Sequence, residues 1–163
     1  PDVGMTETNN FILNAIGIDL GGTWIKGVLM DTNTGEILKQ LYHPTRDAND
    51  PSTTHWQQAV VDTVADLRTF ATDKVVAIGL SAPGLPDAHN HSISFMPGRL
   101  AGLEGLQWGK LLNDRVYVVN DAHAALMAEA RFGAAKGIRH VVMLTLGTGV
   151  GGGVLIDGKL YQG

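Results

Sequence analysis

The chain has 163 residues, of which 44% are hydrophobic and 17% charged, with a formal net charge of −4 and no cysteine. This length suits one domain or two small lobes, and the hydrophobic fraction is sufficient to bury a core. The acidic balance argues against a nucleic acid or an anionic membrane as partner and favours a small metabolite. The lack of cysteine excludes disulfides, thiolate metal sites and a cysteine nucleophile in this chain, and is compatible with a reducing cytoplasm.

The first ten residues are polar and contain no apolar segment of the kind that a signal peptide needs. We expect residues 1–10 to form a disordered tail, with Met5 as a candidate natural start and residues 1–4 as an addition from cloning. No stretch approaches the length of a membrane span, so we expect a cytoplasmic protein without a membrane partner.

A glycine turn lies between two apolar segments of strand character, residues 11–18 and 28–30. The pattern predicts a hairpin that closes at Gly21 and Gly22. Without Cβ atoms, these two residues can take positive φ and bring backbone N–H groups close to an anion, and the Thr23 hydroxyl adds a donor. The turn therefore suits phosphate, although an ordinary hairpin turn with an exposed Asp19 is the alternative.

A third strand is predicted over residues 37–42, ending before Pro44, and a helix is predicted to begin at Asp50-Pro51. Apolar residues recur in this helix at spacings of three and four, which indicates a face turned to the core and not a ligand site. They are Trp56, Val60, Val64, Leu67 and Ala71.

Residues 75–80 form a continuous apolar run, as expected of a parallel strand buried on both faces. Ligands of α/β folds bind at the carboxyl ends of such strands, so the following turn, which contains Pro83 and Gly84, is a candidate wall of a site. A plain turn is the alternative. Residues 85–109 look loop-like, and we expect His89 and His91 to be solvent-exposed and not to bind a metal.

Residues 116–119 predict another buried strand, followed directly by Asn120-Asp121 and by an alanine-rich helix over residues 122–132 that stops at Gly133. This places Asp121 at the carboxyl end of a strand and the amino end of a helix. The carboxylate is either a helix N-cap or a general base that points into the cleft at the strand ends.

Residues 140–146 lead into a second glycine turn at 147–153, and a strand with an Asp157-Gly158 hairpin turn follows. Gly147, Gly149 and Gly152 fit a G-x-G-x-x-G spacing, but the dinucleotide fingerprint must open a helix, so we exclude it. The sequence also lacks the Walker A lysine pattern. The strand, glycine turn and strand repeat the arrangement of residues 11–30, and two such turns facing one another would suit a polyphosphate.

Four motifs in order resemble those of the ROK family (repressors, open reading frames and kinases): D-L-G-G-T at 19–23, S-A-P-G at 81–84, N-D-A at 120–122 and G-T-G-V-G-G-G at 147–153. That family shares a superfamily with hexokinase, actin and the Hsp70 ATPase domain. The resemblance covers about residues 11–163 and implies an α/β, ribonuclease-H-like (actin-like ATPase) fold with ATP and sugar in a cleft between two lobes. It implies a small N-terminal lobe over 11–132 and the start of a large C-terminal lobe over 133–163.

The resemblance also implies a role for each motif. Asp121 would be the catalytic base for the sugar hydroxyl as it attacks the γ-phosphate, and Asp19 would lie near Mg2+, through water. The sugar would contact Asn120, Pro83 and Gly84. The phosphates of ATP would be held by Gly21, Gly22, Thr23, Gly147, Thr148 and Gly149. This agrees with phosphoryl transfer, which needs positioning and charge neutralisation more than covalent help.

Lys26 follows Thr23 by an odd number of residues on the predicted strand, so we expect its side chain on the opposite face and away from the phosphates. The family's kinases are longer than this chain and carry further sugar-binding, adenine-binding and, in many members, zinc-binding segments downstream. We therefore expect the chain by itself to have little or no activity.

The leading hypothesis is an ATP-dependent kinase that acts on glucose or a related hexose, with sugar and nucleotide as partners and without nucleic acid. The alternative is a non-catalytic, sugar-sensing regulator of the same family that lacks its DNA-binding domain. An actin- or Hsp70-like ATPase is a weaker third, because Asn120-Asp121 supplies the base that a hydroxyl acceptor needs. The phosphoryl donor stays open between ATP, another nucleotide and polyphosphate, and a homodimer is compatible with the resemblance.

Overall fold

The computed structural model describes residues 13–47, 55–146 and 150–162. Its main sheet has the strand order β3-β2-β1-β4-β7. The first three strands pair antiparallel, while β4 pairs parallel with both β1 and β7. The strands are β1 (Asn14–Leu20), β2 (Trp24–Asp31), β3 (Ile37–Pro44), β4 (Val75–Ala82) and β7 (Val116–Asn120). The three predicted N-terminal strands and the two later ones therefore form a single sheet.

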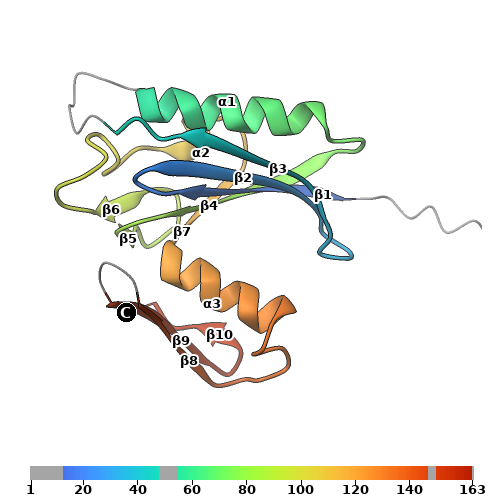
Figure 1. Cartoon of the computed structure of the whole chain (residues 1–163). Coiled ribbons are helices and arrows are strands. Elements are labelled where there is room, and N and C mark those ends of the chain that lie inside the picture. Colours follow the sequence, from blue (N-terminus) through green and yellow to red (C-terminus); the bar gives the residue numbers. More distant parts are fainter. Residues whose placement is uncertain (1–12, 48–54, 147–149, 163) are drawn as a thin grey trace, which may run out of the picture.

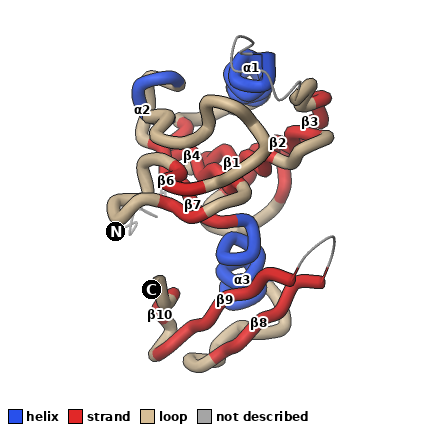
Figure 2. Tube along the Cα trace, turned by 90° about the vertical axis from the view of Figure 1, so that its left-hand side faces the viewer, coloured by secondary structure: helices blue, strands red, loops and turns tan. Residues whose placement is uncertain are grey.

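Helix α1 (His55–Thr69) lies across one face of this sheet, as Figures 1 and 2 show. The predicted apolar stripe faces the sheet, because all four of its helical members are at most 3% exposed. They are Trp56, Val60, Val64 and Leu67. Ala71 lies beyond the end of the helix and is partly buried against the core. The predicted start at Asp50-Pro51 lies outside the described residues.

On the other side of the sheet lies α3 (Asp121–Phe132), and the three-stranded sheet of β8 (Val141–Leu146), β9 (Val150–Ile156) and β10 (Lys159–Leu160) packs against it (Figure 2). Asp157 and Gly158 connect β9 to β10 with φ of 51° and 74°. Positive φ at both central residues is typical of a two-residue hairpin turn, so the predicted Asp-Gly hairpin is confirmed.

The expectation that residues 75–80 are buried on both faces is wrong. In β4, Ile78 and Leu80 are fully buried, whereas Val76 on the alternate face is 37% exposed. Tyr117 of β7, in the other run predicted to be buried, is 47% exposed. The reason is that α1 packs against one face and the described elements cover the second face incompletely.

The chain between β4 and β7 is mostly irregular, as predicted, and contains β5 (Leu85–Pro86), β6 (Ile93–Phe95) and the short α2 (Trp108–Leu111). Trp108 is fully buried, with its ring centroid 6.0 Å from that of Trp56. His89 and His91 are exposed, and the described residues contain no cluster of three potential metal ligands. The burial of Trp108 beside Trp56 shows that apolar packing holds this segment to the core.

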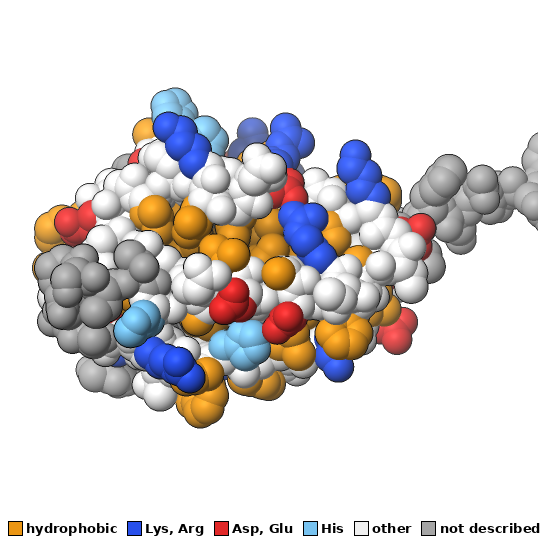
Figure 3. Space-filling model, turned by 90° about the horizontal axis from the view of Figure 1, so that it is seen from above, with side chains coloured by type: hydrophobic (Ala, Val, Ile, Leu, Met, Phe, Trp, Pro, Cys, Tyr) orange, Lys and Arg blue, Asp and Glu red, His pale blue; other side chains and the backbone are white. Residues whose placement is uncertain are grey.

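Charged side chains of both signs are interspersed on the face that carries α1 (Figure 3). No helix in the described part of the chain is long and apolar enough to cross a membrane.

Asp87 organises the loop between β5 and β6. Its carboxylate accepts hydrogen bonds from the Ser92 hydroxyl at 2.5 Å and from the backbone N–H groups of His89 and His91 at 2.7 and 3.2 Å. The hydrogen bond from Ser92 contributes most, and together with those from the backbone it lowers the pKa of Asp87 from 3.8 to about 2, against the opposing effect of burial. The loop is thus tied to an ionised carboxylate.

This lowered pKa predicts a pH dependence of stability. Because the folded-state pKa lies below the ordinary value, the contribution of Asp87 is complete above pH 3.8 and is lost as the pH falls through about 2. We expect wild type to lose more free energy of unfolding than Asp87→Asn when urea denaturation is repeated from neutral pH down to this range. Glu36→Gln, at an exposed carboxylate, is the control. Equal losses in wild type and Asp87→Asn would contradict the role of the carboxylate.

Candidate active site

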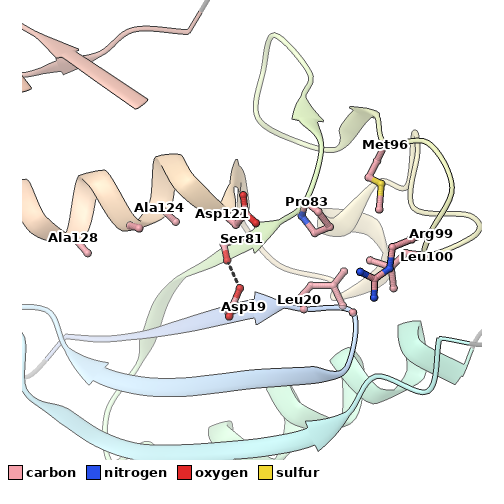
Figure 4. A pocket seen from close by; sticks show the side chains of 13 residues that line it. Asp19, Leu20, Ser81, Pro83, Met96, Arg99, Leu100, Asp121, Ala124 and Ala128 are labelled. Atoms are coloured by element: carbon pink, nitrogen blue, oxygen red, sulfur yellow. Dashed lines mark hydrogen bonds between the residues drawn. The ribbon is translucent and has the colours of Figure 1, made fainter. Parts of the chain in front are cut away.

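A cleft of about 610 Å³ opens where β1 and β4 end, beside α3 and the loop after β6 (Figure 4). Five of the predicted site residues line it, namely Asp19, Gly21, Gly22, Pro83 and Asp121. They meet because β1, β4 and β7 run parallel and present their carboxyl ends at one edge of the sheet. The remaining lining residues are Leu20, Ser81, Met96, Arg99, Leu100, Ala124, Ala125 and Ala128.

Asp19 lies near the end of β1 and is held by both neighbouring strands. The Ser81 hydroxyl on β4 donates to Asp19 Oδ1 at 2.8 Å, and Lys26 Nζ on β2 lies 3.4 Å from Oδ2. The register places Lys26 directly opposite Asp19, a pairing that counting residues from Thr23 did not predict. The carboxylate is thereby oriented at the rim of the cleft.

The glycine turn between β1 and β2 differs from the prediction in its backbone. Neither Gly21 nor Gly22 has positive φ. What the turn uses at Gly21 is the missing side chain, because a Cβ there would lie 2.9 Å from the Trp24 carbonyl oxygen. At Gly22 the space of a Cβ is taken by the Arg99 guanidinium, the end of a flexible side chain. Close approach, and not left-handed backbone, is therefore the reason for glycine here.

Thr45, which follows β3, fixes this turn from the side. Its hydroxyl donates to the Gly21 carbonyl at 2.6 Å and its backbone N–H donates to the Thr23 carbonyl at 3.0 Å. Thr45 is fully buried, so neither bond competes with water. Sequence reasoning missed this residue, since nothing in the chain marks a threonine more than twenty positions away as a partner of the turn.

We predict that Thr45→Val lowers the free energy of unfolding by about 1–3 kcal/mol, because the change keeps the shape and leaves the Gly21 carbonyl without its donor. Thr45→Ser keeps the hydroxyl and should be the more stable variant. Its expected loss of unfolding free energy is about 0.8 kcal/mol, for the removed methyl group. Urea denaturation of the three chains measures both effects. The role assigned to the hydroxyl is wrong if the serine variant is the less stable of the two.

The junction of β7 and α3 separates the roles of Asn120 and Asp121. Asn120 is the N-cap, since its Oδ1 accepts from the backbone N–H groups of Ala122 at 2.9 Å and His123 at 3.4 Å. The alternative that made Asp121 the N-cap is therefore wrong. Asp121 is the first helical residue, with an exposed side chain that lines the cleft.

The side-chain amide of Asn120 is engaged on both sides, because Nδ2 donates to the Gly84 carbonyl at 3.0 Å. It joins the S-A-P-G turn to the start of α3 and so positions Asp121 relative to Pro83. Asn120, Gly84 and Thr23 do not themselves line the cleft. Gly147, Thr148 and Gly149 lie outside the described residues, so the phosphate contacts predicted for them stay predictions.

The charges of the cleft are two carboxylates, Asp19 and Asp121, and one guanidinium, Arg99. Asp19 suits a water-mediated contact with Mg2+, because this ion prefers oxygen ligands and is commonly held by one or two carboxylates, waters and substrate phosphates. Sequence reasoning missed Arg99, and the one signal in the sequence was its place in the glycine-rich loop, directly after Gly98.

The mixed sheet and the cleft at its edge define an α/β protein with a ribonuclease-H-like scaffold. The sequence pattern of the ROK family matches residues 15–163, and the chain belongs to this family. Both the recognised family and the fold class are thereby confirmed, since solved ROK kinases share the fold.

Three proteins illustrate the similarity. A glucokinase from Streptomyces coelicolor is 36% identical over 154 residues, which are 91% of this chain and 45% of that protein. A xylose repressor from Bacillus spizizenii is 33% identical over 155 residues, with 91% and 39% covered. The crystal structure of a ROK family glucokinase from Streptomyces griseus in complex with glucose and AMPPNP superposes with a TM-score of 0.77 at 32% identity, covering 92% of this chain and 46% of that one. The chain thus spans less than half the length of these relatives.

Proposed function

We propose that this chain is part of a sugar kinase that transfers the γ-phosphoryl group of ATP to a hydroxyl of glucose or a related hexose. The observation that carries the proposal is the meeting of Asp121 with Asp19 and the Gly21-Gly22 turn in one cleft. One carboxylate is thus available as a base on the acceptor side, while the other lies beside a turn suited to phosphates. The glucokinases among the relatives support the same assignment.

In this mechanism, Asp121 accepts the proton of the attacking hydroxyl, a contribution that for a positioned general base is typically about 10²- to 10⁴-fold. The Gly22 backbone N–H group and the Thr23 hydroxyl are proposed to bind the phosphates, with Gly147 to Gly149 as the second half of the clamp. The Gly21 N–H is already donated to the Trp24 carbonyl at 3.1 Å, so the part of Gly21 is to let the phosphates approach the backbone. Asp19, held by Ser81, is the residue that would hold Mg2+ through water, and the ion would supply neutralisation of phosphate charge when bound. Asn120 and the Pro83-Gly84 turn are proposed to shape the sugar side.

We further propose that residues 11–132 form the small lobe and that residues 133–163 begin the large one.

The second candidate function is a sugar-sensing regulator, favoured by the 33% identity to a xylose repressor. A non-catalytic regulator needs no general base, so the presence of Asp121 in the cleft favours the kinase.

The deciding experiment measures sugar-dependent formation of ADP by a coupled assay, using the longest protein that carries this chain. A panel of glucose, mannose and their N-acetylamino counterparts tests the acceptor, and inorganic polyphosphate replaces ATP in a second series to test the donor, with sugar phosphate as the readout. Turnover with any sugar supports the kinase. Sugar binding by calorimetry without turnover from either donor would favour the regulator.

A further inference from the structure

We infer that Arg99 binds the terminal phosphate of the phosphoryl donor, over the glycine turn between β1 and β2. This inference rests on the proposed function, and it adds a residue that none of the four motifs contains. The shared chemistry is a phosphate group, and we assign it to the donor and not to a sugar phosphate.

The first argument is the place of the guanidinium. Arg99 projects from the loop after β6 toward the cleft (Figure 4). Its Nη2 atom lies in the space that a Cβ on Gly22 would occupy. Gly22 belongs to the turn that is proposed to hold the phosphates. The arginine therefore lies against the backbone of that turn, where a bound phosphate oxygen would be within its reach.

The second argument is that the loop holds this arginine in place. Gly98 and Leu100, on either side, have φ of 87° and 51°. The Leu100 side chain is 1% exposed, and its backbone N–H donates to Asp47 Oδ2 at 3.2 Å. The Met96 backbone N–H donates to Glu104 Oε1 at 2.6 Å. Anchors before and after Arg99 thus direct its side chain toward the cleft.

The third argument is charge. Arg99 is the one basic side chain among the described residues that line the cleft, where it faces two carboxylates. Within the described part of the chain Arg99 makes no hydrogen bond or ion pair, so no described acceptor competes with a ligand for its five N–H donors. Lys26, the nearby cation on β2, is already paired with Asp19.

A phosphate is the ligand that best matches these donors. The planar guanidinium offers two parallel N–H groups at the spacing of two phosphate oxygens, and such charged pairs are about twice as strong as neutral hydrogen bonds. A sugar hydroxyl, by contrast, needs a proton acceptor in order to attack, and Asp121 is the residue proposed for that role. Arg99 and Asp121 thereby divide the cleft into a donor side and an acceptor side.

The test measures binding by calorimetry on the 163-residue chain, with inorganic tripolyphosphate as the probe. We expect Arg99→Ala to weaken tripolyphosphate binding about tenfold and Arg99→Lys, which keeps a point charge without the fork, to weaken it less. Arg131→Ala is the matched control, because Arg131 is exposed in the last turn of α3 and does not line the cleft. It should bind as wild type does.

Two further measurements separate the possible ligands. The difference in tripolyphosphate affinity between wild type and Arg99→Ala should shrink as ionic strength rises from about 0.01 M to about 0.15 M. Over this range the screening length falls from about 30 to about 8 Å. Glucose 6-phosphate and glucose are titrated in parallel, and we expect Arg99→Ala to change neither affinity by as much as it changes that of tripolyphosphate.

The inference is overturned if wild type fails to bind tripolyphosphate, if Arg99→Ala binds it as wild type does, or if the variant loses mainly glucose or glucose 6-phosphate. Failure of the proposed function would look different. Arg99-dependent binding of tripolyphosphate combined with an absence of sugar phosphorylation in the longest protein would refute the kinase and leave the phosphate site standing.

Discussion

Asp121→Asn is expected to lower kcat by a factor of about 10² to 10⁴ in the longest protein that carries this chain, because an amide cannot accept the proton of the attacking hydroxyl. The substitution keeps the size of the side chain. The N-cap of α3 is Asn120, which the substitution leaves in place. Asp121 Oδ1 also accepts from the Ala122 N–H at 2.8 Å, and the amide oxygen of asparagine can keep this bond. Donor binding, which involves the opposite side of the cleft, should stay close to the wild-type value.

Three readouts make this prediction specific: kcat from the coupled assay, the affinity for tripolyphosphate and the midpoint of thermal unfolding. The matched control is Asp62→Asn, on the exposed face of α1 and outside the cleft, which should change none of the three. Wild-type-like turnover by Asp121→Asn would remove Asp121 from its proposed role. A lower kcat accompanied by a lower midpoint of thermal unfolding would also fail to support a role of Asp121 as the base.

Local patterns predicted much of this architecture. The spacing of Trp56, Val60, Val64 and Leu67 identified the face of α1 that packs on the sheet, because helical periodicity is a property of a short segment. The position of Asp121 after an apolar run likewise placed it at a strand end, and hence at the edge where the cleft lies. Such features depend on residues that are close in sequence.

The contacts that shape the cleft were not predictable in the same way. The hydrogen bond from Thr45 to Gly21, the pairing of Lys26 with Asp19 and the close approach of Arg99 to Gly22 join separate strands and loops. They depend on strand register and loop packing, which a one-residue shift would change. A continuous apolar run also cannot tell how much of a strand face is covered, which is why the double burial expected at Val76 is wrong.

Gly84 connects these long-range contacts to the proposed chemistry. Its φ of 101° is strained for any residue with a side chain. A Cβ there would lie 2.6 Å from the Phe95 carbonyl oxygen and 2.7 Å from the Met96 Cβ. Its own carbonyl accepts the hydrogen bond from Asn120 that ties the turn to α3. A substitution therefore meets a backbone obstacle on one side and displaces the start of α3 on the other.

We predict that Gly84→Ala destabilises the chain by about 1–2 kcal/mol for the backbone conformation and about 1–3 kcal/mol more for the collision. Gly98→Ala is the matched control, because Gly98 has a φ of 87° with open space where a Cβ would project. Gly98→Ala should show only the cost of the backbone conformation. The difference between the urea unfolding free energies of the two variants therefore gives the cost of the Cβ collision at Gly84. Equal losses would mean that the end of β6 at Phe95 and the adjacent Met96 move aside at no cost. In the longest protein, Gly84→Ala should also lower kcat relative to wild type, because moving the Gly84 carbonyl releases Asn120 and with it the orientation of Asp121. A variant that loses stability but keeps the wild-type kcat at a temperature where it is folded would show that Asp121 is positioned by α3 alone.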